Sequence, residues 1–207
     1  MSTKVMVRGK NSDKIRKMVQ IGVLSAIAVV LMLFEIPLPF APAFYEIDFS
    51  EVPVMIGAFA MGPMAAIIIE FMKILLNFAI NGTATAGVGE IANFLIGIAF
   101  VLPAALIYRR EKSRRAATMG MAIGSLFMTV VGCVLNAYVL LPVYAKAFSM
   151  PIEGLVAMGT AVNKGIDSIL TFVIFAVAPF NLLKGVLVSV IVFLIYKKIS
   201  VILKGNR

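Results

Sequence analysis

Long apolar segments, separated by short polar or basic stretches, dominate this sequence. They cover residues 18–35, 52–80, 91–107, 117–141 and 180–196. A helix of about 20 apolar residues spans the ~30 Å hydrocarbon core of a bilayer. The chain is 61% hydrophobic and only 14% charged, whereas soluble domains are roughly 45–50% apolar and about 25% charged. We therefore predict an all-α integral membrane bundle, because lipid offers no hydrogen bonds to an open backbone.

The basic residues gather in three clusters that flank the apolar segments. These clusters cover residues 4–17, 109–115 and 197–207, and they hold all but four of the 19 basic residues. Cytoplasmic loops of membrane proteins carry the excess of Lys and Arg, so we predict that all three clusters face the cytoplasm and contact anionic lipid. The net charge of +9 therefore indicates orientation, and we predict no binding of nucleic acid.

The number of crossings follows from this orientation, because an even number must separate any two cytoplasmic clusters. Gly62-Pro63 interrupts the segment 52–80, and such a pair is typical of a helix end. We expect two crossings there, the shorter one ending at Pro63; a re-entrant hairpin is the alternative. Residues 142–179 contain several glycines and prolines, and we expect them outside or folded back at the outer surface, although 166–175 is apolar enough to enter the bilayer.

The predicted architecture is thus a bundle of six transmembrane helices with the N- and C-termini in the cytoplasm. It divides into a basic cytoplasmic N-terminal segment, a six-helix transmembrane substrate-binding domain and a cytoplasmic tail, at residues 1–17, 18–200 and 201–207.

Residue types that many reactions require are missing. The chain has no histidine, which excludes histidine acid–base catalysis, Ser-His triads and histidine metal sites. Its single cysteine, Cys133, permits no internal disulfide and no CxxC motif. There is no G-x-x-x-x-G-K-S/T loop for ATP hydrolysis. We therefore predict a binding protein that is not an enzyme and has no metal or cofactor.

Polar residues recur near the outer ends of the predicted helices. They are Asn77, Asn93, Asn136 and Asn181, together with Glu90 and Lys184. Amides both donate and accept hydrogen bonds, and the set predicts a pocket for an uncharged or weakly charged polar ligand. Phe44 and Tyr45 in the first outer loop could stack on a planar ring. Alternatively, each Asn could simply join neighbouring helices.

Two other pairs of charged residues have structural interpretations. Asp48 and Glu51 have the spacing of a helix N-cap with an acidic third residue, although a ligand or lid role for this loop is the alternative. Glu70 and Lys73 lie three apart and can pair on one helix face. A coupled pair carrying protons or substrate is the second interpretation of Glu70 and Lys73.

Five short segments carry a resemblance to a known family that extends over residues 18–200. They are Ile47-Asp48-Phe49-Ser50-Glu51-Val52-Pro53, Gly62-Pro63, Gly89-Glu90-Ile91-Ala92-Asn93-Phe94, Leu135-Asn136 with Leu141-Pro142-Val143-Tyr144, and Pro179-Phe180-Asn181-Leu182-Leu183-Lys184-Gly185. In these segments the chain resembles the substrate-binding subunits (S components) of energy-coupling factor (ECF) transporters, and most of all their riboflavin-specific type.

The resemblance implies a multi-pass protein of the bacterial plasma membrane that captures riboflavin at the outer face, under the first loop. It implies that a separate transmembrane coupling protein and two ATP-binding cassette ATPases supply the energy. Asn181 and Lys184 would contact the ring edge, and Asn136, Asn93 and Glu90 would complete the pocket. Family members pack an Ala-x-x-x-Ala patch against the coupling protein; here the nearest element is Gly22 and Ala26, with Ser25 nearby.

Three other functions remain open at this point. The chain could be an S component for another vitamin, a small membrane enzyme acting on lipid head groups through Glu70/Lys73 or Glu90/Lys184, or a self-sufficient ion-coupled carrier. The absence of histidine and of a carboxylate-rich metal motif argues against the enzyme.

Overall fold

The computed structural model describes the backbone of residues 2–39, 41–42 and 44–204, and the side chains of these ranges from residue 12 to residue 195. The side chains of Lys4, Arg8 and Lys10 and those of the basic cluster at 197–207 lie outside the described residues. Of the predicted tail at 201–207, only the backbone up to Lys204 is described.

The predicted all-α class is confirmed, because most of the described chain is helical. In chain order the helices are α1 (Ser2–Met32), α2 (Glu51–Met61), α3 (Pro63–Asn81), α4 (Val88–Arg110), α5 (Arg114–Leu135), η1 (Asn136–Leu140), α6 (Leu141–Ala147), α7 (Ile152–Val162), α8 (Ile169–Phe172), η2 (Val173–Val177) and α9 (Ala178–Lys204). Two short antiparallel strands, β1 (Ile36–Pro37) and β2 (Glu46–Ile47), pair within the connection from α1 to α2.

Five stretches of the described chain are long and apolar enough to cross a membrane, where the sequence predicts six spans. They are Ser12–Met32, Pro63–Asn81, Val88–Arg110, Arg114–Ala147 and Ile169–Ile195. The expected helix break at Gly62-Pro63 is confirmed, since α2 ends at Met61 and α3 begins at Pro63. Gly62 has φ +99°, a backbone conformation that side-chain-bearing residues rarely adopt. The resulting α2 has only 11 residues, too few to span by itself.

The ends of the last two spans differ from the prediction. The span expected at 117–141 runs from Arg114 to Ala147, and the span expected at 180–196 begins at Ile169. In each case a five-residue π-helical turn, η1 or η2, precedes a proline, Pro142 or Pro179. A proline inside a helix clashes with the carbonyl four residues earlier, and the wider π turn lets both helices continue through it.

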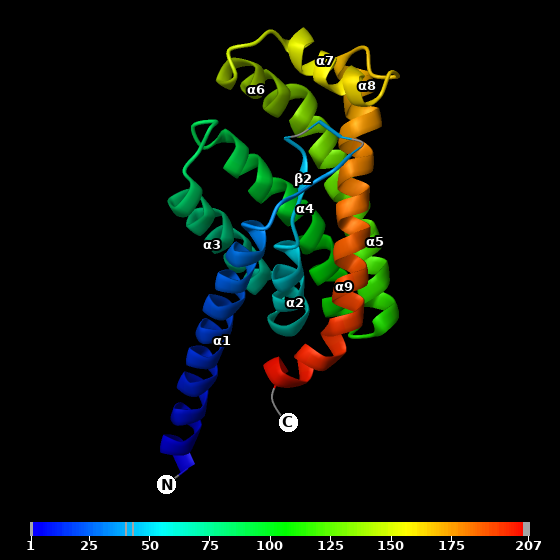
Figure 1. The fold of residues 1–207 in the computed structure, drawn as a ribbon. Helices are drawn as coiled ribbons and strands as arrows, with labels where there is room; N and C mark the ends of the chain where they lie inside the picture. Colours follow the sequence, from blue (N-terminus) through cyan, green and yellow to red (C-terminus); the bar gives the residue numbers. More distant parts are fainter. Residues whose placement is uncertain (1, 40, 43, 205–207) are drawn as a thin grey trace.

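The two ends of the bundle have different structures (Figure 1). Both termini lie at one end, together with the turn between α4 and α5, and the β1–β2 connection and helices α6 to α8 lie at the other. The core between them contains residues such as Met55, Ile69, Phe100 and Met128. A smaller apolar cluster near α6 to α8 contains Tyr45, Leu141 and Phe172, and it supports the loop that covers the cavity described next.

Candidate binding site

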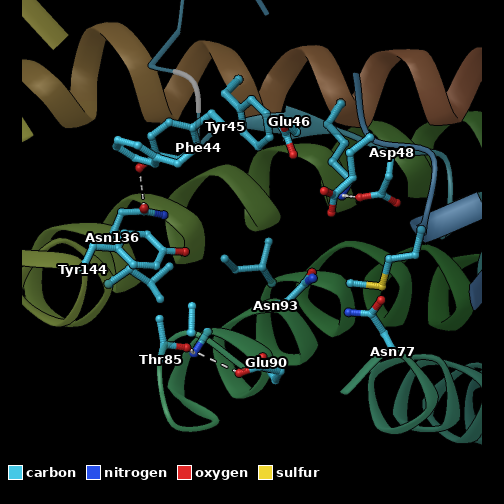
Figure 2. A pocket seen from close by; sticks show the side chains of 18 of the residues that line it. Phe44, Tyr45, Glu46, Asp48, Asn77, Thr85, Glu90, Asn93, Asn136 and Tyr144 are labelled. Atoms are coloured by element: carbon cyan, nitrogen blue, oxygen red, sulfur yellow. Dashed lines mark hydrogen bonds and ion pairs between the residues drawn. The ribbon is translucent and has the colours of Figure 1, made fainter. Parts of the chain in front are cut away.

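A cavity of about 330 Å³ lies at the end of the bundle opposite the termini. All eight residues that the sequence predicts for ligand binding line it: Phe44 and Tyr45 from the β1–β2 connection, Asn77 from α3, Glu90 and Asn93 from α4, Asn136 from η1, and Asn181 and Lys184 from α9. Figure 2 shows the labelled side chains among them around a common space: Phe44, Tyr45, Asn77, Glu90, Asn93 and Asn136. Sequence reasoning therefore identified side chains that share one cavity; their role in binding stays a prediction.

Two of these amides, Asn136 and Asn181, are held in fixed orientations. Asn136 is 3% exposed; its Nδ2 donates to the Gly132 carbonyl at 2.8 Å, and its Oδ1 accepts from the Tyr45 hydroxyl at 2.6 Å. Asn181 is also 3% exposed, and its Nδ2 donates to the Val177 carbonyl at 2.9 Å. Both acceptor carbonyls lie one turn earlier in the same helix. Each amide therefore presents its remaining hydrogen-bonding capacity to the cavity.

Aromatic side chains form one wall of the cavity. The Tyr45 ring lies 4.8 Å from that of Phe44 and 5.2 Å from that of Phe180, measured between centroids. Phe44 also lies 5.7 Å from Tyr144. These separations are those of packed aromatic pairs. Burial raises the pKa of Tyr45, so its hydroxyl stays a hydrogen-bond donor, and the wall offers flat apolar surface with one fixed polar atom.

Lys184 joins the first loop to α9. Its Nζ lies 2.8 Å from Oδ2 of Asp48, and both side chains are largely buried. Burial alone would raise the pKa of Asp48, but the charges of Lys184 and Lys73, with hydrogen bonds from Lys184 and Ser50, hold this pKa well below its usual range. The predicted capping pair of Asp48 and Glu51 is therefore wrong: α2 begins at Glu51, and Asp48 Oδ1 accepts from the Ser50 backbone N–H instead.

Glu90 belongs to a hydroxyl-rich turn at the start of α4. Its Oε2 accepts from the Thr83 hydroxyl at 3.1 Å. The Thr85 hydroxyl accepts from the Gly89 backbone N–H at 2.9 Å, which satisfies one of the free N–H groups at this helix start. Gly87, with φ +90°, precedes the helix. The turn thus places Glu90 at the floor of the cavity, opposite the aromatic wall (Figure 2).

Some lining residues were not among the predicted binding residues. They are Glu35 and Glu46 at the β1–β2 pair, Asp48, Thr85, Tyr144 and Phe180. Partial burial, and then hydrogen bonding to and repulsion from Glu46, raise the pKa of Glu35 to about 7. The sequence signal for the two glutamates is weak, because they lie 11 residues apart and meet only through the pairing of β1 with β2.

A second polar cluster lies fully buried close to Asp48. Lys73 Nζ lies 2.7 Å from Oε1 of Glu51 and 2.8 Å from Oε1 of Glu70, and none of the three side chains is more than 2% exposed. The predicted pairing of Glu70 with Lys73 is therefore confirmed, with Glu51 as an unforeseen third member. Glycine at position 97 of α4 provides the space, because a Cβ there would meet the Glu70 carboxylate.

The residues predicted for partner binding do not all share one face of α1. Gly22 and Ala26 are exposed, and a Cβ at position 22 would have no atom within 4 Å. Ser25 is 2% exposed, and its hydroxyl donates to the Ile21 carbonyl at 2.8 Å. Ser25 therefore faces the bundle interior and is not accessible to a partner. Within the described residues, no group of His, Cys, Asp and Glu has the arrangement of a metal site.

Comparisons with known proteins agree with this architecture. The family model described as "ECF transporter, substrate-specific component" matches residues 16–196. The riboflavin transporter FmnP of Bacillus subtilis (strain 168) is 34% identical over 195 residues, which cover 94% of this chain and 97% of the relative. The riboflavin transporter RibU of Staphylococcus aureus (strain TCH60) is 33% identical over 197 residues, covering 95% and 97%.

A solved structure, described as "Structure and mechanism of the S component of a bacterial ECF transporter", has the same fold. It superposes with a TM-score of 0.72 at 34% sequence identity and covers 93% of this chain and 99% of its own. The resemblance found in five short segments thus extends over nearly the whole chain.

Proposed function

Because the chain belongs to the family of substrate-specific components of ECF transporters, we propose that it binds riboflavin in the cavity lined by the four asparagines, Glu90 and Lys184. One observation carries this proposal: six segments of the chain bring amides, a carboxylate, an ammonium and an aromatic wall to one cavity. The related riboflavin transporters of two bacteria add support. Members of this family are transport components, and the chain is accordingly a transporter subunit and not an enzyme.

The chemistry of riboflavin fits these side chains. Asn181 and Lys184 would hydrogen-bond the carbonyls and imide of the ring edge, and Asn136, Asn93 and Glu90 would receive the rest of the ring and the ribityl hydroxyls. An ammonium has three N–H donors. Lys184 can therefore keep its 2.8 Å contact with Asp48 and still donate to the ring. Phe44 and Tyr45 would cover the ring face.

The orientation in the membrane is also a proposal. In our assignment α2 and the connection that leads into it together form the sixth, short crossing, with residues 1–17 and 201–207 in the cytoplasm and 18–200 as the transmembrane domain. The basic clusters support this, because the described Arg109, Arg110 and Arg114 lie at the end of the bundle that carries the termini. The cavity then opens to the extracellular side of the bacterial cell membrane.

Transport energy would come from other subunits. The sequence has no phosphate-binding loop for ATP, and the family name itself specifies a substrate-specific component. We propose that a separate transmembrane coupling protein and two ATP-binding cassette ATPases complete the transporter. Gly22 and Ala26, on the exposed face of α1, would let a helix of the coupling protein approach closely.

Quenching of riboflavin fluorescence on titration with the purified protein tests the binding site. Replacing Asn181 or Lys184 by Ala should weaken affinity by about tenfold or more, since a lost buried hydrogen bond costs roughly 1–3 kcal/mol. Lys146→Ala and Asn163→Ala are matched controls, because both residues are exposed and lie outside the cavity lining. Unchanged riboflavin affinity in Asn181→Ala and Lys184→Ala would overturn the proposed site. If the protein binds another vitamin tightly and does not bind riboflavin, the proposed substrate is wrong.

A further inference from the structure

A second cavity, of about 290 Å³, lies at the end of the bundle that carries both termini. It is enclosed by the turn between α4 and α5, the end of α2 and the last described turns of α9. Lys112, Ser113 and Arg114 supply its polar lining, and Phe59 and Tyr108 supply an aromatic wall with ring centroids 4.7 Å apart. None of these residues belongs to the riboflavin site.

The charge of this second cavity is positive. The salt bridges among the described side chains involve Lys73 and Lys184, both elsewhere in the molecule, so neither Lys112 nor Arg114 is neutralised by one of them. Ser113 is the N-cap of α5, and the start of this 22-residue helix adds a partial positive charge. An anionic group is therefore the ligand that this lining favours.

An apolar groove of about 560 Å³ continues from the cavity along the outside of the bundle, between α5 and α9. Met121, Phe193 and Leu194 line both spaces. Further along, the groove is lined by Ala122, Leu126, Leu182, Val186 and Val190. Along α9 it extends from Leu182 to Leu194, or ~18 Å at a rise of 1.5 Å per residue, which is close to one leaflet of a ~30 Å hydrocarbon core.

We propose that the second cavity and the groove together bind one anionic phospholipid of the leaflet next to the chain termini. The phosphate headgroup lies between Lys112 and Arg114, and an acyl chain lies in the groove between α5 and α9. The basic cavity continues directly into an apolar groove about as long as one leaflet is thick. A phospholipid, with a charged headgroup and an apolar chain, matches this arrangement better than a protein helix does. Moreover, α1, which carries Gly22 and Ala26, packs against α2 and α3, away from this groove.

Native mass spectrometry of the full-length protein, extracted from vesicles of phosphatidylcholine and phosphatidylglycerol, tests the headgroup contacts. One phosphatidylglycerol should stay bound to the wild type. The double variant Lys112→Ala/Arg114→Ala should retain it about 25-fold less, at about fivefold per basic side chain. Arg109→Ala/Arg110→Ala removes the same charge from exposed positions outside the cavity and should retain the lipid. An equal loss in both double variants would mean diffuse attraction and overturn the proposal.

Two tryptophan variants test the acyl-chain groove with all basic residues in place. Ala122→Trp should fill the groove and release the lipid, whereas Ile123→Trp, exposed on the next position outside it, should not. Melting temperatures and riboflavin affinities verify that every variant is folded. Displacement of the lipid by excess sodium phosphate would indicate a phosphate site instead. If Ala122→Trp retains the lipid but no longer binds the coupling protein, the groove is a binding site for that protein. Either this result or displacement by phosphate overturns the proposal.

Discussion

Lys73 is buried between two carboxylates in the middle of the bundle, next to the loop that covers the cavity. One ammonium faces two carboxyl groups here, and Glu51 Oε2 and Glu70 Oε2 have no hydrogen-bond partner among the described residues. Removing the single buried cation is far more costly than removing the charge of one of its two acidic partners. The three residues should therefore respond very differently to mutation.

We predict that Lys73→Met lowers the free energy of unfolding by about 3–5 kcal/mol, because it leaves two buried carboxylates without a cation. Glu70→Gln should cost much less, because Lys73 keeps Glu51 as its buried counter-ion. Thermal unfolding in detergent measures both, with Lys146→Met as the exposed control. If Glu70→Gln proves as destabilising as Lys73→Met, the charge balance of the cluster is not what governs its stability.

The Glu35 carboxyl at the β1–β2 pair should make stability depend on pH. Its pKa is raised from 4.5 to about 7, so the folded protein holds a proton that the unfolded chain releases. The contribution of Glu35 to stability is therefore fully present below pH 4.5, falls as the pH rises, and is lost above about pH 7. Asp48 stays ionised throughout this range because its pKa is lowered.

Melting temperatures recorded between pH 5 and pH 8 test this linkage. The melting temperature of the wild type should fall as the pH rises over this range, and that of Glu35→Gln should fall less steeply. The exposed Glu153→Gln on α7 is the matched control and should follow the wild type. A wild-type slope that persists in Glu35→Gln would assign the pH dependence to another group.

The candidate site shows which residues a sequence can identify. Amides such as Asn136 and Asn181 stand out because polar groups are rare within apolar helices. Asp48 and Glu51 had a plausible local partner in each other, but the structure pairs them with Lys184 and Lys73, 136 and 22 residues away in the chain. Such long-range pairs depend on how the helices pack, and spacing along one segment does not contain that information.

At the level of elements, the positions of the membrane-spanning segments could be predicted from the sequence better than the residues at which they begin and end. The break at Gly62-Pro63 follows from local chemistry. Local chemistry does not predict that the last two spans continue through Pro142 and Pro179, because proline ordinarily ends a helix. The π turns η1 and η2 keep both helices intact, and residues 169–179 thereby join the last span instead of the outer surface.

Close contact between α4 and α5 depends on two glycines of α5. A Cβ at Gly120 would lie 3.0 Å from the Ala104 backbone, and one at Gly124 would meet the Phe100 carbonyl. The spacing Gly120-x-x-x-Gly124 is typical of tightly packed membrane helices. Since α4 and α5 share the most extensive helix contact in the described chain, this pair should dominate the stability of the bundle.

We predict that Gly124→Ala destabilises the protein by about 1–3 kcal/mol, because overpacking outweighs the ~0.5–1 kcal/mol that alanine gains over glycine within a helix. Gly22→Ala on α1 is the control, since a Cβ there meets nothing within 4 Å, and it should be neutral or slightly stabilising. Thermal unfolding of both variants in the same detergent decides this. Equal stability of the two would mean that α4 and α5 can separate without cost.

At the scale of the whole molecule, the proposed binding and coupling sites occupy different places. The proposed riboflavin cavity lies at the end opposite the termini, whereas the exposed small residues Gly22 and Ala26 lie on the flank of α1. The charges divide similarly, with all but four of the basic residues in the three clusters and eight of the ten acidic residues elsewhere. From this separation we expect that a mutation on the exposed face of α1 can abolish assembly with the coupling protein while the cavity stays intact.

We predict that vesicles containing only this chain bind riboflavin at the membrane but do not accumulate it. Vesicles that also contain the coupling protein and its ATPases should accumulate riboflavin when ATP is supplied. Gly22→Leu/Ala26→Leu should leave riboflavin affinity unchanged and reduce both assembly and ATP-driven uptake by about tenfold or more, since a bulky side chain keeps packed membrane helices apart. Ala157→Leu, an exposed alanine on α7, should behave as the wild type. Uptake in vesicles that lack the partners would instead identify an ion-coupled carrier, because the chain would then need no other source of energy.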